Sequence, residues 1–228
     1  MSIFGTLDVY NDDVPRSAAT NMAIDEALFE NVKVPSLRLY RWDHPALSFG
    51  YFGRYADVSF YQSERELVRR WTGGGIVLHG DDLTYSIVIP GRDSAFAESS
   101  MSIYEKIHRA LCNAIVATGQ HAVVAAVADR GPGVRDASYS GHCFANPVRA
   151  DVLLDGRKIA GAAQRKTRAG LLQQGSIQRV DLAPDFEFHF ARALCNAVDS
   201  KDLSENILER ANEIADQKYS TQTWLKRR

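Results

Sequence analysis

Cysteine is scarce in this sequence, with only Cys112, Cys143 and Cys195 among 228 residues. Three cysteines that lie this far apart are too few for a disulfide framework, and they lack the paired spacing of a zinc site. Sparse cysteine is typical of proteins from a reducing compartment. We therefore expect a cytoplasmic location.

The sequence also lacks an excess of positive charge and a long apolar run. Its formal net charge is −1, which excludes the positive field that draws a protein to nucleic acid or anionic lipid. No apolar run approaches the roughly 20 residues that cross a bilayer. Residues 1–11 have no basic stretch before an apolar one, which is unlike a signal peptide. Neither nucleic acid nor a membrane is expected as a partner.

Enough apolar material is present to build a hydrophobic core. Hydrophobic residues make up 45% of the sequence and charged residues 24%, as in ordinary globular proteins. A length of 228 residues suits one domain.

Helical patterns occur near both ends of the chain and once in the middle. Helices are predicted at 20–31, 102–118, 185–197 and 202–219. The first has an apolar side and a wet side, and Asp25 and Glu26 are expected on the wet side. Gly119 is expected to end the second helix. Asp202 and Glu205 have the spacing of a capping box at the start of the last one.

Strand patterns occupy the middle of the chain. They are predicted at 37–40, 47–52, 76–78, 83–89 and 171–182. Asp155-Gly156, between the apolar runs around 153 and 159, predicts a hairpin with a two-residue turn. Because strands dominate the middle and helices the ends, the order predicts an α+β fold and not an alternating β-α-β one.

Three consecutive glycines, Gly73, Gly74 and Gly75, are the most informative local feature. They follow Arg69 and Arg70 closely, and a glycine loop beside arginines can bind phosphate or carboxylate. The loop has no P-loop signature, and it leads into a strand, whereas a dinucleotide-binding loop leads into a helix. A glycine bulge within a sheet is the structural alternative.

Three other residues allow both a structural and a functional interpretation. His79 closes the strand after the glycines, and a lone histidine is more often structural than catalytic. Lys158 is either a solvated hairpin lysine or a partly buried amine that polarises an acyl carbonyl. Cys143 ends an irregular, glycine- and serine-rich segment at 129–147, where a cysteine beside a histidine can serve as a nucleophile. Cys112 and Cys195 fall in predicted helices, and we expect them to be buried and inert.

Two long segments together resemble the signatures of the biotin/lipoate A/B protein ligase family. Residues 69–79 read Arg-Arg-Trp-Thr-Gly-Gly-Gly-Ile-Val-Leu-His and resemble R-R-x-[ST]-G-G-x-x-V-x-H. Residues 155–164 read Asp-Gly-Arg-Lys-Ile-Ala-Gly-Ala-Ala-Gln and resemble D-G-x-K-I-x-G-[SA]-A-Q. Residues 174–177, Gln-Gly-Ser-Ile, resemble H-G-[ST]-[IL], with Gln174 in place of the usual histidine. Residues 21–28 and 218–224 are also similar to the family.

The resemblance implies a mixed β-sheet with flanking helices, like the catalytic domain of class II aminoacyl-tRNA synthetases and biotin/lipoate ligases. It implies a single catalytic domain over 1–228, without an accessory C-terminal domain. Lys158 would contact the acyl carbonyl, the glycine loop would wall the acyl pocket, and His79 would shape it. The substrate-binding residues implied are Arg69, Arg70, Gly73, Gly74, Gly75, His79, Ala160, Gly161 and Gly175.

Two reactions occur in this family, and the residues bear on the choice. A cysteine-dependent octanoyltransferase takes octanoate from acyl carrier protein through an enzyme thioester, whereas a lipoate-protein ligase activates the free acid with ATP. Cys143-Phe144 and the segment 83–86 resemble the transferase type. The third glycine, Gly75, resembles the ligase type. We favour the transferase, with Cys143 and Lys158 as its catalytic residues.

The favoured reaction implies particular partners and cofactors. The transferase needs no metal and no cofactor, and the ligase needs ATP and Mg²⁺; octanoate or lipoate is the acyl substrate in both. The acceptors would be lipoyl-domain carriers, such as the glycine cleavage H protein and the E2 subunits of 2-oxoacid dehydrogenases, with acyl carrier protein as donor. A non-catalytic acyl-binding homologue is a further alternative.

Overall fold

The computed structural model describes residues 2–126 and 148–227, and its main element is one eight-stranded mixed sheet. The strand order is β11-β1-β2-β6-β10-β9-β8-β7. The bounds are Leu7–Arg16 for β1, Ser36–Trp42 for β2, Leu83–Pro90 for β6, Ala122–Val124 for β7, Val152–Leu154 for β8, Arg157–Lys166 for β9, Gly170–Ile177 for β10 and Val198–Lys201 for β11. β1 pairs in parallel with β2 and β11, and every other pair in this sheet is antiparallel.

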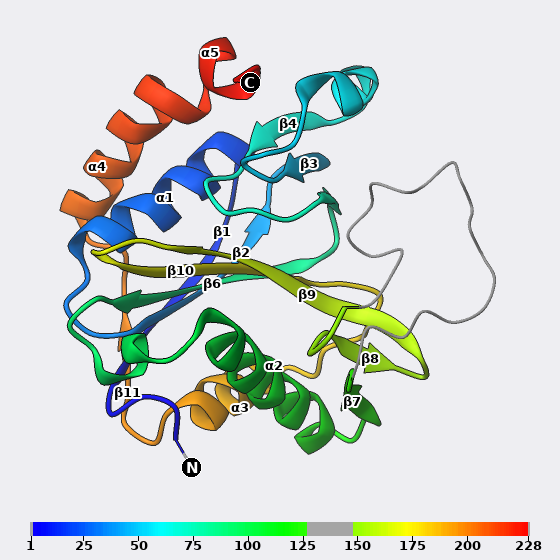
Figure 1. Cartoon of the computed structure of the whole chain (residues 1–228), viewed down its shortest axis with the longest axis vertical. Helices are drawn as coiled ribbons and strands as arrows, with labels where there is room; N and C mark the ends of the chain where they lie inside the picture. The colour runs from blue at the N-terminus through cyan, green and yellow to red at the C-terminus, as the bar shows by residue number, and fades with distance from the viewer. Residues whose placement is uncertain (1, 127–147, 228) are drawn as a thin grey trace.

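Helices cover both faces of this sheet (Figure 1). On one face lie α2, Ser100–Ala117, and α3, Phe186–Leu194, whose apolar sides pack on β2, β6 and β10. On the other lie α1, Ala18–Asn31, and α4, Glu205–Ile214. A π-helical turn, Ala215–Tyr219, and the short α5, Gln222–Leu225, follow α4. In the described part of the chain, no helix is long and apolar enough to cross a bilayer.

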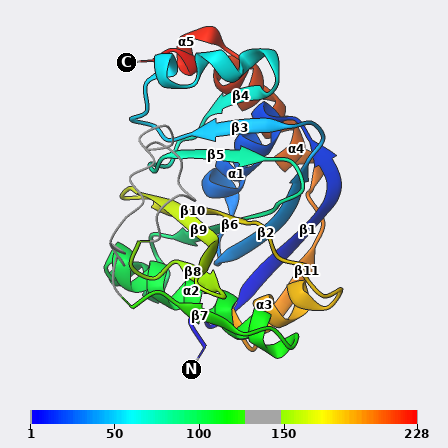
Figure 2. The ribbon, with the colours of Figure 1, turned by 90° about the vertical axis from the view of Figure 1, so that its right-hand side faces the viewer.

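A second, three-stranded sheet lies beside α1, above the middle of the main sheet (Figure 2). Its order is β4-β3-β5, with β3 at Ala46–Phe49, β4 at Glu66–Arg69 and β5 at Ile76–His79. Short 3-10 turns at Tyr55–Asp57 and Ser59–Ser63 connect β3 to β4, and a third at Ser94–Ala97 precedes α2. Leu47, Phe49, Val58 and Leu225 form a small core that joins this sheet to α5.

The α+β mixed sheet with flanking helices is confirmed, and so are several local predictions. α2 ends before Gly119, which has a φ of +90°. The turn between β8 and β9 places Asp155 at φ +50° and Gly156 at φ +75°, the two positive values of a type I′ hairpin.

Other local predictions were wrong. Asp25, expected on the wet side of α1, is fully buried. The N-cap of α4 is Ser204, whose hydroxyl accepts from Ile207 N–H, so Asp202 begins no capping box. The last strand ends at Ile177 and not at 182. The sequence did not predict β1, β4, β7 or β11.

Candidate acyl-binding site

A pocket lies where the main sheet faces α1 and the small sheet, and its empty volume, which includes some open solvent, is about 430 Å³. The main sheet provides most of its wall, because β2, β6, β9 and β10 all contribute side chains. The lining residues are Met22, Tyr40, Trp42, Ser48, Arg70, Val77, His79, Thr84, Lys158, Gly161, Ala162, Ala163, Gln174, Gly175 and Ser176. Five of the residues implied by the family resemblance are therefore brought to one pocket: Arg70, His79, Lys158, Gly161 and Gly175.

Lys158 is buried, with only 6% of its surface exposed. Its ammonium lies 2.8 Å from the carboxylate of Asp151. The pairing of β8 with β9 shifts register next to Lys158. The side chain folds over Gly161, where an added Cβ would come within 2.7 Å of Nζ. The solvated hairpin lysine is thus excluded, and glycine at 161 leaves room for the ammonium.

The carboxylate of Asp151 is held by two further groups. Tyr104, from α2, donates its hydroxyl proton to Oδ1 at 2.7 Å, and the Val148 N–H donates to Oδ2 at 2.7 Å. The Tyr104 oxygen accepts in turn from Ala162 N–H. Burial, with Asp151 nearby, raises the pKa of Tyr104, so this phenol stays a neutral donor. The Lys158 ammonium therefore has a fixed counter-ion.

The glycine loop holds the Arg70 side chain through hydrogen bonds. Its guanidinium donates to Ser48 Oγ at 2.7 Å, to Gly73 O at 3.0 Å and to Gly75 O at 2.8 Å. Gly74 has a φ of +83°, and a Cβ there would lie 3.1 Å from Ala163. None of the three glycines lines the pocket. The carbonyls of Gly73 and Gly75 thus face Arg70.

His79 fixes the inner wall of the pocket. Its ring stacks on Trp42 with centroids 3.9 Å apart. One ring nitrogen lies 2.8 Å from Asp82 Oδ2 and the other 2.6 Å from Ser48 Oγ. Burial lowers the pKa of His79, although Asp82 opposes that change. Both ring nitrogens are thus engaged by neighbouring side chains, and the ring lines the pocket.

Gln174 connects the pocket to a buried polar network. Its amide donates to Asp25 Oδ2 at 2.7 Å, and its carbonyl accepts from Thr72 Oγ1 at 2.7 Å. A second contact from the amide reaches Met22 Sδ at 3.3 Å. Gln174, in place of the family's usual histidine, therefore ties α1 to the residue that precedes the glycine loop.

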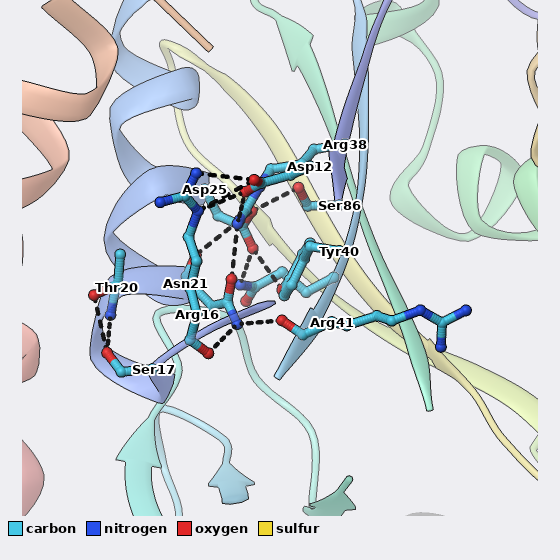
Figure 3. A network of polar contacts seen from close by, with 11 residues as sticks. Asp12, Arg16, Ser17, Thr20, Asn21, Asp25, Arg38, Tyr40, Arg41 and Ser86 are labelled. Atoms are coloured by element: carbon cyan, nitrogen blue, oxygen red, sulfur yellow. Dashed lines mark hydrogen bonds and ion pairs between the residues drawn. The ribbon is translucent and has the colours of Figure 1, made fainter. Parts of the chain in front are cut away.

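The network centres on Arg38, whose side chain is fully buried (Figure 3). Its guanidinium lies 2.7 Å from Asp12 and 2.8 Å from Asp25, and 4.0 Å above the ring of Tyr40. Burial acts to raise the pKa of Asp12, but bonds and charges from Arg16 and Arg38 outweigh it and lower the pKa. The buried Arg38 guanidinium thus pairs with two carboxylates beneath the pocket, and Arg16 supplies a second positive charge at Asp12.

Arg69 and Ala160 are not brought to the pocket. The Arg69 guanidinium donates to the carbonyls of Gly53 at 2.6 Å, Leu225 at 2.9 Å and Arg227 at 2.7 Å. It therefore attaches the C-terminal segment to the small sheet. Ala160 is buried in the main core. Gly175 is required for packing, because a Cβ would come within 2.5 Å of the Tyr85 ring.

The structure describes two of the three cysteines. Cys112 and Cys195 are buried, as predicted, and burial raises the pKa of Cys112. Cys143 lies outside the described residues. Asp151, Ser48 and Trp42 were missed by the sequence argument. Of these, only Asp151 had a recognisable sequence signal: it directly precedes the apolar strand β8, which the hairpin turn joins to the strand that contains Lys158.

Comparison with known proteins identifies relatives of this chain. Residues 17–209 match the model of the lipoyl protein ligase A/B catalytic domain. The chain is 37% identical to an octanoyltransferase LipM of Oceanobacillus iheyensis, over 73% of this chain and 62% of that protein. It is 34% identical to octanoyltransferase LipM of Staphylococcus epidermidis, over 86% of this chain and 74% of the relative. The chain thus spans less than two thirds of the length of the first relative.

Solved structures share the fold. Lipoate-protein ligase A bound with ATP superposes with a TM-score of 0.74 at 22% identity, covering 99% of each chain. A bipartite lipoate-protein ligase from Thermoplasma acidophilum, solved as part of a study that includes its E2 lipoyl domain, gives a TM-score of 0.71 at 21% identity over 98% and 96% of the two chains. At these identities the likeness confirms the fold of lipoate-protein ligases, which is that of class II aminoacyl-tRNA synthetases.

Proposed function

This chain belongs to the lipoyl protein ligase A/B catalytic-domain family, and we propose that it transfers an octanoyl group from acyl carrier protein to a lysine of a lipoyl domain. The observation that carries the proposal is the buried Lys158–Asp151 pair at 2.8 Å in the wall of the pocket. A fixed ammonium in a site sheltered from water stabilises the oxyanion of acyl transfer. The octanoyltransferase relatives support the choice of acyl group.

The reaction has two acyl transfers through Cys143. The Cys143 thiolate attacks the carbonyl of the donor thioester, and the donor thiolate leaves and takes up a proton. The lysine amine of the lipoyl domain then attacks the new thioester. An amide bond forms, the amine loses its proton, and Cys143 leaves as thiolate. Lys158 faces the negative oxygen in both steps, and the glycine loop acts through Arg70.

Lipoyl domains of the glycine cleavage H protein and of E2 subunits are the acceptors that we propose. A ligase that uses Mg²⁺ and ATP is the competing function, and the third glycine of the loop, Gly75, is the feature that favours it. The two functions differ in their donor. The transferase needs a thioester, and the ligase needs a free acid and a nucleotide.

Intact mass of an apo lipoyl domain separates these functions. The domain is incubated with the protein and either octanoyl-acyl carrier protein or octanoate with ATP and Mg²⁺. We expect the octanoyl mass increase with the first donor only. An increase with the second donor only would establish the ligase, and none with either would leave an acyl-binding protein.

Cysteine variants test the acyl-enzyme. Cys143→Ser should stop transfer from octanoyl-acyl carrier protein, because the reaction passes through its sulfur. Cys112→Ser and Cys195→Ser are matched controls that should keep transfer, because both thiols are buried. With donor alone, the wild type should gain one octanoyl adduct that hydroxylamine removes. A Cys143→Ser variant that transfers at the wild-type rate would contradict the mechanism.

A further inference from the structure

Arg165 lies on the same strand as the pocket wall, outside the residues that line the pocket. Ala163 lines the pocket, and alternate residues of a strand share a face. Arg165 therefore follows Ala163 on that face, about 7 Å further along β9. Within the described residues β8 pairs with β9 only as far as Ala160, so the outer edge of β9 is unpaired from the pocket to Arg165.

Two aromatic rings hold the guanidinium of Arg165. Its Cζ lies 4.5 Å from the centroid of Trp71 and 5.0 Å from that of Tyr51. Contact through the faces of a guanidinium fixes its plane but does not occupy the N–H groups at its edge. The two rings thus fix the orientation of the Arg165 guanidinium, and its N–H groups, which lie at the edge of the guanidinium plane, remain available to an acceptor.

Among the described residues, few groups accept hydrogen bonds from the Arg165 guanidinium. In the part of the chain that the structure describes, the single hydrogen bond of Arg165 is a long one, from Nη1 to Trp71 O at 3.4 Å. Its Nε is buried and has no partner among those residues. A buried donor without a partner loses its water and gains nothing in return. An anion that accepted from the Nε edge would correct this deficit.

Two further cations adjoin the same rings. Lys218 Nζ lies 5.1 Å from the centroid of Trp71, and Arg227 Cζ lies 4.7 Å from that of Tyr51. Lys218 is paired with Glu26 at 2.6 Å, but no salt bridge joins Arg165 or Arg227 to a described carboxylate. Among the described residues, Glu26 is thus the one carboxylate within salt-bridge distance of these three cations. The excess of positive charge favours an anion of more than one negative oxygen, such as phosphate.

We propose that Arg165, with Lys218 and Arg227 beside it, binds the phosphate of the phosphopantetheine arm that brings the octanoyl group to the pocket. The inference rests on the proposed thioester donor. Lys158 Nζ lies against Gly161, and the four residues from there to Arg165 span roughly 13 Å of strand. An extended pantetheine arm bridges such a distance, with its thioester at Lys158 and its phosphate at Arg165.

The test compares two small donors, octanoyl-pantetheine and octanoyl-4′-phosphopantetheine, in the formation of the acyl-enzyme followed by mass. The wild type should use the phosphorylated donor about tenfold better in kcat/KM, the worth of one charged hydrogen bond. In Arg165→Gln this preference should disappear through KM, while the rate with octanoyl-pantetheine stays unchanged. Arg168→Gln, which alters an exposed arginine of the next turn, should keep the preference.

Comparing the two donors also controls for folding. If Arg165→Gln slows both donors by the same factor, the preference for the phosphorylated donor is unchanged and the variant has damaged the pocket in general; that result would overturn the assignment. A preference that survives in Arg165→Gln, or a wild type with no preference, would also overturn it and leave the transferase intact. Absence of an adduct with either donor would instead remove the proposed function. The same variants are assayed with octanoate and ATP, and an effect of Arg165 confined to that reaction would assign the phosphate to the nucleotide.

Discussion

At the residue scale, the ammonium of Lys158 and the carboxylate of Asp151 share a site from which water is nearly excluded. Their side chains are 4% and 0% exposed. Lys158→Met should abolish transfer and also lower the free energy of unfolding by about 3–5 kcal/mol, because Asp151 stays buried without its counter-ion. Urea unfolding and the mass assay measure the two effects.

A double variant separates stability from catalysis. Lys158→Met with Asp151→Asn removes both charges and should recover most of the lost stability, since no uncompensated ion remains. It should still fail to transfer. Recovery of activity in the double variant would show that Lys158 serves only to neutralise Asp151.

Gly161 offers a finer test of the same site. A Cβ at 161 would meet Cε and Nζ of Lys158 at 2.6 and 2.7 Å and Asp151 Oδ1 at 3.2 Å. The flexible lysine end can shift by about 1 Å and stay paired with Asp151, so little stability is lost. Gly161→Ala should therefore leave the urea midpoint nearly unchanged and reduce kcat by about 100-fold, as expected for a group displaced by about 1 Å. Gly73→Ala is the matched control, because nothing lies within 4 Å of its Cβ position. Equal losses in both variants would contradict the positioning role.

These residues also show how far the sequence could predict the site. Lys158, Arg70 and His79 were recognised because they lie in contiguous signatures. Asp151 was not recognised, because it lies outside both signatures, directly before β8, and only the fold brings its carboxylate to Lys158. For the same reason the sequence placed Arg69 at the substrate, whereas its guanidinium binds the carbonyls of the C-terminal segment.

At the scale of elements, α1, β1 and β2 are joined by charge as well as by apolar contact. Arg38 on β2 bonds Asp12 of β1 and Asp25 of α1. Arg38→Met should lower the free energy of unfolding by at least about 3 kcal/mol, because both carboxylates stay buried. Arg54→Met is the matched control: Arg54 pairs with Asp57 at the surface, where the two side chains are 80% and 46% exposed, and a pair so exposed contributes about 1 kcal/mol or less. Similar losses in the two variants, measured in urea, would argue against a central role for Arg38.

The same network explains which elements the sequence could not predict. β1 contains Asp12, Asp13 and Pro15, residues that are depleted in strands. Its middle nevertheless lies inside the sheet because Arg38 accepts Asp12 as a partner. Helical periodicity predicted that Asp25 faces solvent. It is buried instead, because Arg38, Tyr40 and Ser86 donate hydrogen bonds to its carboxylate in the interior. By contrast, α2 and the Asp155-Gly156 hairpin depend on local signals and were predicted.

At the scale of the whole molecule, helices on both faces of the sheet place ionisable groups deep inside. His108, on α2, is fully buried between Ala150 O at 2.6 Å and the Tyr85 hydroxyl at 2.8 Å. Burial lowers the pKa of His108 to about 4 from 6.5. Burial also acts on Asp82, but its hydrogen bonds and His79 prevail and lower the pKa of Asp82 below 3.8. Titration of His108 and titration of Asp82 therefore change the free energy of unfolding in different ranges of pH.

The consequence is a loss of stability on mild acidification that His108 causes. Between pH 6.5 and about 4, the unfolded chain binds a proton at this histidine and the folded chain does not, so the free energy of unfolding falls as pH drops, by about 3 kcal/mol in all. His79, whose pKa burial also lowers, adds a loss in the same direction below pH 6.5, and Asp82 adds its own loss only below pH 3.8. In His108→Gln the amide keeps a donor and an acceptor but cannot titrate, so urea unfolding between pH 7 and 4.5 should show a shallower decline than in the wild type. His44→Gln, at an exposed site, should follow the wild type. Parallel curves for all three proteins would mean that His108 is not the source of the acid sensitivity.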